Sequence, residues 1–208
     1  AGRRAGWIAA GIAALYPALW INDVVLMSET MYAFVLVLVV LLAYRLWEAP
    51  GRRRALLLGV AIAVATLTRS EALLLLAFVA LPITLGARGL AREARLRLLV
   101  TTTVAVVLVL APWIVFNLGR FEKTTVLSTS AGTFLSLGNC DETYYDPDLM
   151  GFPYPCDTVG GQPALAGLDE SQLDAVLRDR STTYIRDNLG RTPLVAAVRV
   201  GRTFGFWD

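Results

Sequence analysis

The sequence predicts an all-α polytopic membrane protein, with about five transmembrane helices followed by an extracytoplasmic loop that carries a surface amphipathic helix. Three observations support this fold class. Hydrophobic side chains make up 56% of the 208 residues and charged ones 17%, whereas soluble domains have about 45–50% and about 25%. The apolar residues gather in five stretches. Residues 1–117 carry a net charge of +6 and residues 118–208 one of −4, so the two halves are predicted to face different surroundings.

Polar or charged turns separate the five candidate spans. These spans cover residues 7–21, 29–47, 55–68, 70–85 and 98–116. The third and fourth are short, but a single helix over both would run about 46 Å, too long for one crossing. It would also place Arg69 at mid-bilayer, at a cost of about 2.5–3.5 kcal/mol. We therefore expect a turn at the membrane surface around residues 68–71.

The distribution of arginine sets the predicted orientation. With five crossings, ten arginines fall in loops on one side, and only Arg69 falls in the short loops on the other. Because cytoplasmic loops accumulate basic residues, the amino end is predicted to be cytoplasmic. The composition is typical of a bacterium, which makes the cytoplasmic (inner) membrane the expected location. We expect a membrane region over 1–117, an extracytoplasmic loop segment over 118–192 and the start of a further membrane segment over 193–208.

Two features stand out in the predicted outer loop. Apolar residues recur at helical spacing from 168 to about 188, with Asp169 or Ser171 as the candidate N-cap, which predicts an amphipathic helix on the membrane surface. Cys140 and Cys156 are the only cysteines. In an oxidising compartment they predict a disulfide worth about 3 kcal/mol. The alternatives are two free thiols or, with less support, a two-cysteine metal site.

The chain contains no histidine. This excludes, within these residues, a Ser-His-Asp or Cys-His nucleophile system, a histidine-ligated haem and a Cys/His zinc site. No other metal site is predicted from the ligand pattern. Chemistry in this chain therefore has to come from carboxylates, arginines and amides.

Polar residues are predicted to converge at the outer ends of the spans. They are Asn22, Asp23, Ser28, Glu29, Arg69, Ser70, Glu71 and Asn117. Ionisable residues at a membrane boundary indicate a site when they have a partner, and Glu29 and Arg69 form a candidate pair. Each also has a structural alternative, because Glu29 suits a helix N-terminus and Arg69 suits an anchor to lipid head groups.

A series of short motifs resembles a known family. The motifs are residues 14–17 (Ala-Leu-Tyr-Pro), 26–30 (Leu-Met-Ser-Glu-Thr), 67–71 (Leu-Thr-Arg-Ser-Glu), 112–117 (Pro-Trp-Ile-Val-Phe-Asn), 127–132 (Leu-Ser-Thr-Ser-Ala-Gly) and 137–139 (Leu-Gly-Asn). Their order and spacing resemble the GT-C superfamily of integral membrane glycosyltransferases, near the bacterial protein-mannosyltransferase and aminoarabinose-transferase branches. The resemblance covers nearly the whole chain. Phe116 departs from it, since family members often carry an arginine there.

The resemblance implies transfer of a sugar from a polyprenyl-phosphate donor to an acceptor hydroxyl at the outer face of the cytoplasmic membrane. A leaving phosphate needs cationic stabilisation, for which Arg69 is the first candidate and Arg199 and Arg202 are the second. For the last two, anchoring to phospholipid head groups is an equal alternative. Glu29 either orients Arg69 or binds the acceptor or a divalent cation, and Glu71 lies beside it.

The remaining expected site residues are amides. Asn117 and Asn139 either bind sugar hydroxyls or cap backbone groups. The family's general base would precede residue 1, so the chain is expected to be a fragment that is inactive alone. The expected partners are the polyprenyl-phosphate sugar, membrane lipids and an unidentified acceptor, with no nucleic acid.

Two other functions remain open. The first is a transporter or flippase for a lipid-linked substrate, which predicts broken helices or charges at mid-membrane and internal repeats. The second is a non-catalytic membrane subunit of cell-envelope polymer assembly, with the acidic, cross-linked outer loop as its docking surface.

Overall fold

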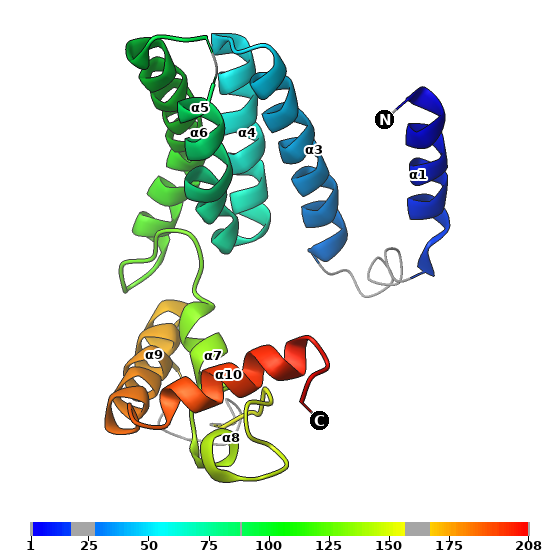
Figure 1. The fold of residues 1–208 in the computed structure, drawn as a ribbon. Coiled ribbons are helices and arrows are strands. Elements are labelled where there is room, and N and C mark those ends of the chain that lie inside the picture. The colour runs from blue at the N-terminus through cyan, green and yellow to red at the C-terminus, as the bar shows by residue number, and fades with distance from the viewer. Residues whose placement is uncertain (1, 18–27, 88, 157–166, 208) are drawn as a thin grey trace. The chain divides into compact units, whose positions relative to one another are not determined.

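The computed structural model describes residues 2–17, 28–87, 89–156 and 167–207, and every regular element in these ranges is helical (Figure 1). The elements are α1 (Arg3–Leu15), α3 (Glu29–Glu48), α4 (Arg52–Thr68), η1 (Ser70–Leu74), η2 (Leu76–Ala80), α5 (Leu81–Leu85), α6 (Arg92–Arg120), α7 (Ala131–Ser136), α8 (Asp141–Tyr145), α9 (Glu170–Asp187) and α10 (Thr192–Thr203). The chain forms two compact units, residues 1–112 (unit 1) and 113–208 (unit 2). Each unit is described by itself.

The prediction of about five transmembrane helices is wrong. Among the described residues, two helices are long and apolar enough to cross a membrane: α3, with 20 residues, and α6, with 29. Helix α1 ends after 13 residues, or about 20 Å, against a hydrocarbon core of about 30 Å. The third predicted span corresponds to α4, which has 17 residues. The sidedness derived from five crossings therefore loses its basis.

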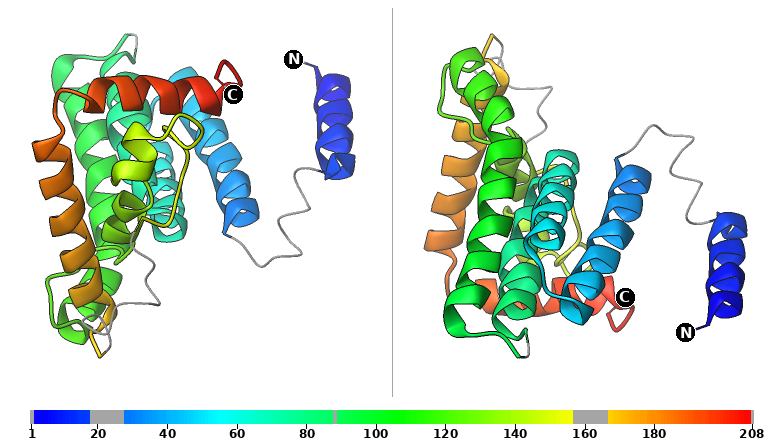
Figure 2. Two further views of the ribbon diagram at one scale, coloured as in Figure 1. Left: turned by 90° about the horizontal axis from the view of Figure 1, so that it is seen from below. Right: turned by 90° about the horizontal axis from the view of Figure 1, so that it is seen from above.

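Helix α4 owes its apolar sequence to packing inside unit 1. Eight of its 17 residues are buried, and five of these are alanine or glycine. It lies beside α3 in all three views of the ribbon (Figures 1 and 2). The Thr102 hydroxyl of α6 donates to the Ala55 carbonyl of α4 at 3.1 Å. Small residues let helices approach this closely, and hydropathy alone does not separate such a helix from one that faces lipid.

The fourth predicted span is broken into three short pieces. Arg69 ends α4 in an extended conformation, with φ −145° and ψ 118°. A 3₁₀ segment (η1), a π segment (η2) and the short α5 follow it. The expected turn at residues 68–71 is therefore present, but the segment after it is not one continuous helix.

The outward faces of the two candidate spans are apolar. In α3, Phe34 and Val37 are 70% and 69% exposed, and in α6, Leu108 and Val115 are 67% and 68% exposed. Only 28% of each apolar window is buried, whereas the core helix of a soluble protein is mostly buried. Large exposed apolar surface of this kind indicates contact with a membrane or a partner, and it supports membrane association.

The close approach of α4 to α6 gives a testable expectation at Gly59. A Cβ added there would lie 2.3 Å from the Thr102 carbonyl oxygen and 2.7 Å from the Ala105 Cβ. We expect Gly59→Ala to lower the free energy of unfolding by about 1–3 kcal/mol through overpacking. Thermal unfolding in detergent measures this effect. The control is Gly11→Ala, where a Cβ meets nothing within 4 Å, and equal stability of the two variants would contradict the tight contact.

Unit 2 is more compact than a surface loop. Helix α9 spans 18 residues from Glu170, close to the predicted range, and packs against α7. A Cβ at Gly132 of α7 would lie 2.1 Å from the Asp174 carbonyl oxygen of α9. The Asp174 carboxylate also accepts the Gly132 N–H at 2.5 Å. The face of α9 that is buried here is thus mostly polar, and it contacts protein.

Residues 193–208 do not continue as a long apolar helix in the described part of the chain. Helix α10 has 12 residues, about 18 Å. Val195 and Val198 are buried within unit 2. Gly205 follows with a φ of +70°, in the left-handed region that glycine tolerates.

Asp169 caps α9 and predicts a local pH dependence. Its Oδ1 accepts bonds from the Ser171 hydroxyl at 2.6 Å and the Gln172 N–H at 2.7 Å, and its Oδ2 accepts the Glu122 N–H. These bonds, that from Ser171 first, lower the pKa of Asp169 to about 2. Since the unfolded pKa is about 3.9, the cap stabilises the unit above about pH 4 and weakens as the pH falls towards 2.

NMR signals of the Gln172 and Glu122 amides should report this titration. We expect a midpoint near pH 2 in the intact protein. In Asp169→Asn, which keeps the Oδ1 acceptor without a titrating group, this transition should be absent. A midpoint near 3.9 would show that the carboxylate does not make these bonds in solution.

Candidate functional site

The candidate site in unit 1 is centred on the Arg69 guanidinium. Its Nε donates to Glu71 Oε1 at 2.7 Å and its Nη1 to Glu29 Oε1 at 3.0 Å. The Tyr32 ring lies beside the guanidinium, 5.9 Å from Cζ to the ring centroid. The Nη2 donors have no partner among the residues that the structure describes. The side chains of Arg69 and Glu29 are 33% and 35% exposed, so the cluster is half-buried and open on one side.

The local fold explains why these groups meet. Glu29 begins α3 and Arg69 follows the last residue of α4, and the two helices run antiparallel as neighbours (Figure 1). The extended backbone of Arg69 separates α4 from η1, and the Arg69 carbonyl accepts the Ala72 N–H at 2.9 Å. This arrangement places Glu71 beside the guanidinium. The predicted pair of Glu29 and Arg69 is therefore present, and Glu71 completes it.

The electrostatics favour the ionised forms of Arg69 and Glu71. The hydrogen bond to Glu71 raises the pKa of Arg69. The pKa of Glu71 is lowered, first by its own backbone N–H and then by Arg69. One guanidinium and two carboxylates give a formal charge of −1. An anionic ligand would therefore have to meet the Nη2 donors, which the two carboxylates do not use.

Two polar atoms in the first turn of α3 were not predicted from the sequence. Glu29 Oε2 and Thr30 Oγ1 are buried, and neither has a hydrogen-bond partner among the described residues. A buried unpaired polar atom costs about 1–3 kcal/mol, so each is a candidate contact for a ligand. Tyr32 was also missed, although its position three residues after Glu29 places both on one face of α3.

Arg199 and Arg202 bind backbone carbonyls within unit 2. Arg199 Nη2 donates to the Gly138 carbonyl, and its Cζ lies 5.9 Å from the Tyr144 ring centroid. Arg202 donates through Nε to the Met150 carbonyl and through Nη2 to the Asp148 carbonyl, both at 2.9 Å. These arginines thus hold α10 to the segment 138–150. Their role as phosphate ligands stays a prediction.

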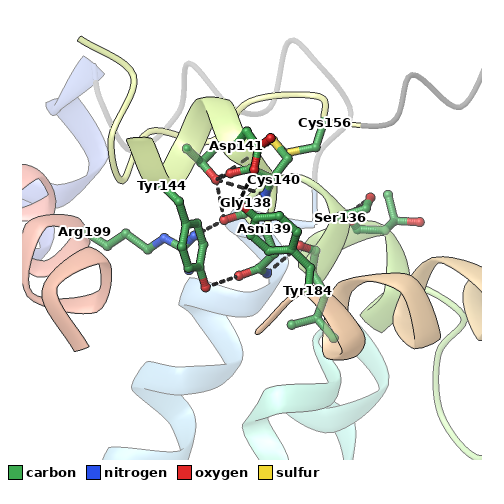
Figure 3. Close-up of a disulfide and its surroundings, with 12 residues drawn as sticks. Ser136, Gly138, Asn139, Cys140, Asp141, Tyr144, Cys156, Tyr184 and Arg199 are labelled. Atoms are coloured by element: carbon green, nitrogen blue, oxygen red, sulfur yellow. Dashed lines mark hydrogen bonds between the residues drawn. A yellow bond between two sulfur atoms is a disulfide. The ribbon is translucent and has the colours of Figure 1, made fainter. Parts of the chain in front are cut away.

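The two asparagines differ in how their amides are used. Asn139 donates to the Leu135 carbonyl at 2.7 Å and accepts the Tyr144 hydroxyl at 3.0 Å (Figure 3), which matches the backbone-capping alternative. Asn117 is 1% exposed and donates to the Val126 carbonyl at 3.3 Å, while its buried Oδ1 has no partner in the described parts of the chain. Asn117 therefore retains a free acceptor.

The predicted disulfide between Cys140 and Cys156 is confirmed (Figure 3). Asp141, directly after the first cysteine, accepts the Tyr184 hydroxyl of α9 at 2.7 Å. Burial, and then this bond, raises the pKa of Tyr184. The cross-link therefore lies beside hydrogen bonds from tyrosine hydroxyls, and no periodic pattern in the sequence predicts these bonds.

The described part of the chain contains no preformed cluster of metal ligands. No three Cys, Asp or Glu side chains gather there. Glu29 and Glu71 are the two carboxylates at Arg69. Asn22 and Asp23, which were expected at the same end, lie outside the described residues.

The site residues fall into both units. Arg69, Glu29 and Glu71 belong to unit 1, and Asn117, Asn139, Arg199 and Arg202 belong to unit 2. In comparisons with models of protein families, with curated proteins and with solved structures, no match to this chain was found.

Proposed function

We propose that this protein is a membrane glycosyltransferase, which moves a sugar from a polyprenyl-phosphate donor to an acceptor hydroxyl at the outer face of the cytoplasmic membrane. The observation that carries the proposal is the Arg69 guanidinium, held by Glu29 and Glu71 with its Nη2 donors free. A transferase of this kind has to stabilise charge on a leaving phosphate, and a preorganised donor does this best.

Position and geometry favour a lipid phosphate as the ligand of Arg69. The guanidinium lies at the amino end of α3, a helix apolar enough to cross a membrane, so a lipid tail can follow the helix while its phosphate meets Arg69. The two carboxylates hold Nε and Nη1, which orients the two Nη2 N–H donors before the ligand arrives. Each of these N–H groups can donate a charge-assisted hydrogen bond to a phosphate oxygen.

The formal charge of −1 sets a condition on this proposal. The attraction between Arg69 and a phosphate is opposed by the two carboxylates behind it. A divalent cation on the unpaired Glu29 Oε2 would change the formal charge of the cluster from −1 to +1. An acceptor hydroxyl at the same atom would instead donate a hydrogen bond to it. Loss of transfer in EDTA that Mg²⁺ or Mn²⁺ restores would favour the cation, and transfer that resists EDTA would favour the hydroxyl.

The disulfide supports the proposed compartment. Disulfides persist in oxidising compartments and are rare in the cytosol, so the bond between Cys140 and Cys156 supports an extracytoplasmic position for residues 118–192. This argument does not depend on the number of crossings.

A direct test uses membranes from cells that produce the protein, incubated with a panel of radiolabelled polyprenyl-phosphate sugars. We expect the label to move from the lipid fraction to an acceptor, and membranes without the protein serve as the control. No transfer from any donor in the panel would count against the proposal.

One observation favours a transporter of lipid-linked substrates as the second candidate. The segment after Arg69 is broken into 3₁₀, π and α pieces, and discontinuous helices beside an ionised residue occur at transporter binding sites. The same assay separates the two functions. A transporter would move the labelled lipid between leaflets without forming a new glycosidic bond.

A further inference from the structure

An apolar groove of about 520 Å³ lies in unit 1, away from the Arg69 cluster. Its walls are the carboxyl half of α3 and the chain from η2 into α5. The wall from α3 includes Val40, Ala43, Tyr44 and Trp47, and Phe78 and Ile83 face it from the other side. The volume falls within the range of about 300–1,000 Å³ that is typical of ligand sites.

The π segment shapes the second wall. Pro82 has no N–H and cannot complete an α-helical bond to the Phe78 carbonyl. The Leu81 N–H instead donates to Leu76, five residues back, and the Thr84 hydroxyl donates to the Ala80 carbonyl at 2.7 Å. π turns inside helices are frequent at functional sites. On the facing wall, Ala43 is small and leaves the space open.

The groove opens onto the apolar surface of a candidate span. Phe78 is 73% exposed and Tyr44 is 59% exposed. Tyr44 lies in the carboxyl half of α3, a helix that is apolar enough to cross a membrane, and Phe78 faces it from η2. An exposed apolar surface on such a helix suits contact with lipid chains. We therefore expect the groove to take its occupant from the bilayer.

Arginines gather at the end of the groove. Arg45 lies within the last turn of α3, and Arg52, Arg53 and Arg54 begin α4 after a short turn. All four are exposed. On the other wall, Arg95 Nη1 donates to the Leu85 carbonyl at 3.0 Å, two residues beyond Ile83. Basic residues beside an apolar surface attract anionic lipid head groups, each contributing measurably to binding.

The nearby acids do not cancel this charge. Glu93 pairs with Arg97 at 3.6 Å, which leaves Glu48 as the one other acid between residues 40 and 100 besides Glu71 at the Arg69 cluster. Arg69 itself lies at the opposite end of α3. Glu29, its partner, is 15 residues from Tyr44, or about 22 Å along the helix. The groove is therefore separate from the proposed donor site.

We propose that the groove binds an acyl chain of an anionic phospholipid, with the phosphate head group against Arg45 and the arginines at the start of α4. The apolar walls hold the chain, and the arginines select the charge. This site is distinct from that of the glycosyl donor, and it does not require the protein to be a transferase.

Native mass spectrometry of the detergent-purified protein tests the proposal, with phosphatidylglycerol and phosphatidylcholine added in turn. We expect one phosphatidylglycerol to be retained, with at least tenfold preference over phosphatidylcholine. Neutralising three arginines in R52Q/R53Q/R54Q should remove the preference while weak retention of both lipids persists. Equal retention of the two lipids by the unmodified protein would overturn the proposal.

Two exposed valines of α3 provide a matched pair. Val40 lines the groove, and Val37, one turn earlier, does not. Val40→Phe should fill the groove and lower lipid retention at least tenfold, whereas Val37→Phe should leave it unchanged. An equal loss in both variants would show that binding is not in the groove.

Fluorescence gives a second measurement on the unmodified fold. Trp47 lines the groove, so phosphatidylglycerol brominated on its acyl chains should quench its emission. Trp47→Phe should remove that part of the quenching. Displacement of the bound phospholipid by polyprenyl phosphate would assign the groove to the donor lipid and overturn the proposal.

Discussion

Replacing Arg69 with alanine is expected to lower sugar transfer from polyprenyl-phosphate donors by about 10²- to 10³-fold, the usual effect of removing one preorganised donor from a developing negative charge. The variant loses the Nη2 donors and leaves Glu29 and Glu71 without their cation. Arg69→Lys keeps the charge but not the planar fork, so we expect an intermediate loss. Initial rates in membranes, normalised to the amount of inserted protein, measure both effects.

Stability and insertion should change little in Arg69→Ala. The ion pairs of Arg69 are one-third or more exposed, and exposed pairs contribute about 0–1 kcal/mol. Arg97→Ala is the matched control, because it removes an exposed arginine that pairs with Glu93 in the same unit. It should transfer sugar at the normal rate. Normal turnover by Arg69→Ala would remove Arg69 from the phosphate site.

The pairing of Glu29 with Arg69 could be predicted because it depends only on the arrangement of two consecutive helices. An antiparallel pair of helices joined by a short turn brings the start of the first to the end of the second, and α3 and α4 do this whatever the number of crossings. The same reasoning placed Glu71 nearby. It missed Tyr32 and the unpaired oxygen of Glu29, since both depend on side-chain directions.

The predicted number of spans was wrong because an apolar segment can either face lipid or pack inside the protein. Residues 55–68 are apolar to pack α4 between its neighbours, with Gly59 against the backbone of α6, and residues 70–85 are apolar but interrupted by a π turn ahead of Pro82. Neither feature changes mean hydropathy. In unit 2 the contacts join polar groups more than 40 residues apart, such as Asp141 with Tyr184, and no short-range pattern predicts them.

Removing the disulfide is expected to cost unit 2 about 3 kcal/mol, from the loop-closure entropy of a cross-link of this length. Cys140 and Cys156 are 16 residues apart. The loop between them carries Tyr144, which is fully buried, and the carbonyls of Asp148 and Met150 that bind Arg202. Without the cross-link the loop gains freedom in the unfolded state, so the contacts that hold α10 should open first.

Hydrogen exchange of the full chain shows which segments lose protection when the disulfide is removed. Peptides from residues 138–156 and 192–203 should exchange faster in C140S/C156S, whereas peptides from α3 and α4 should not change. The single variant C156S should match the double variant, because either one removes the cross-link. Protection equal to that of the unmodified protein would mean that the polar contacts of Tyr144, Tyr184 and Arg202 hold the loop without the bond.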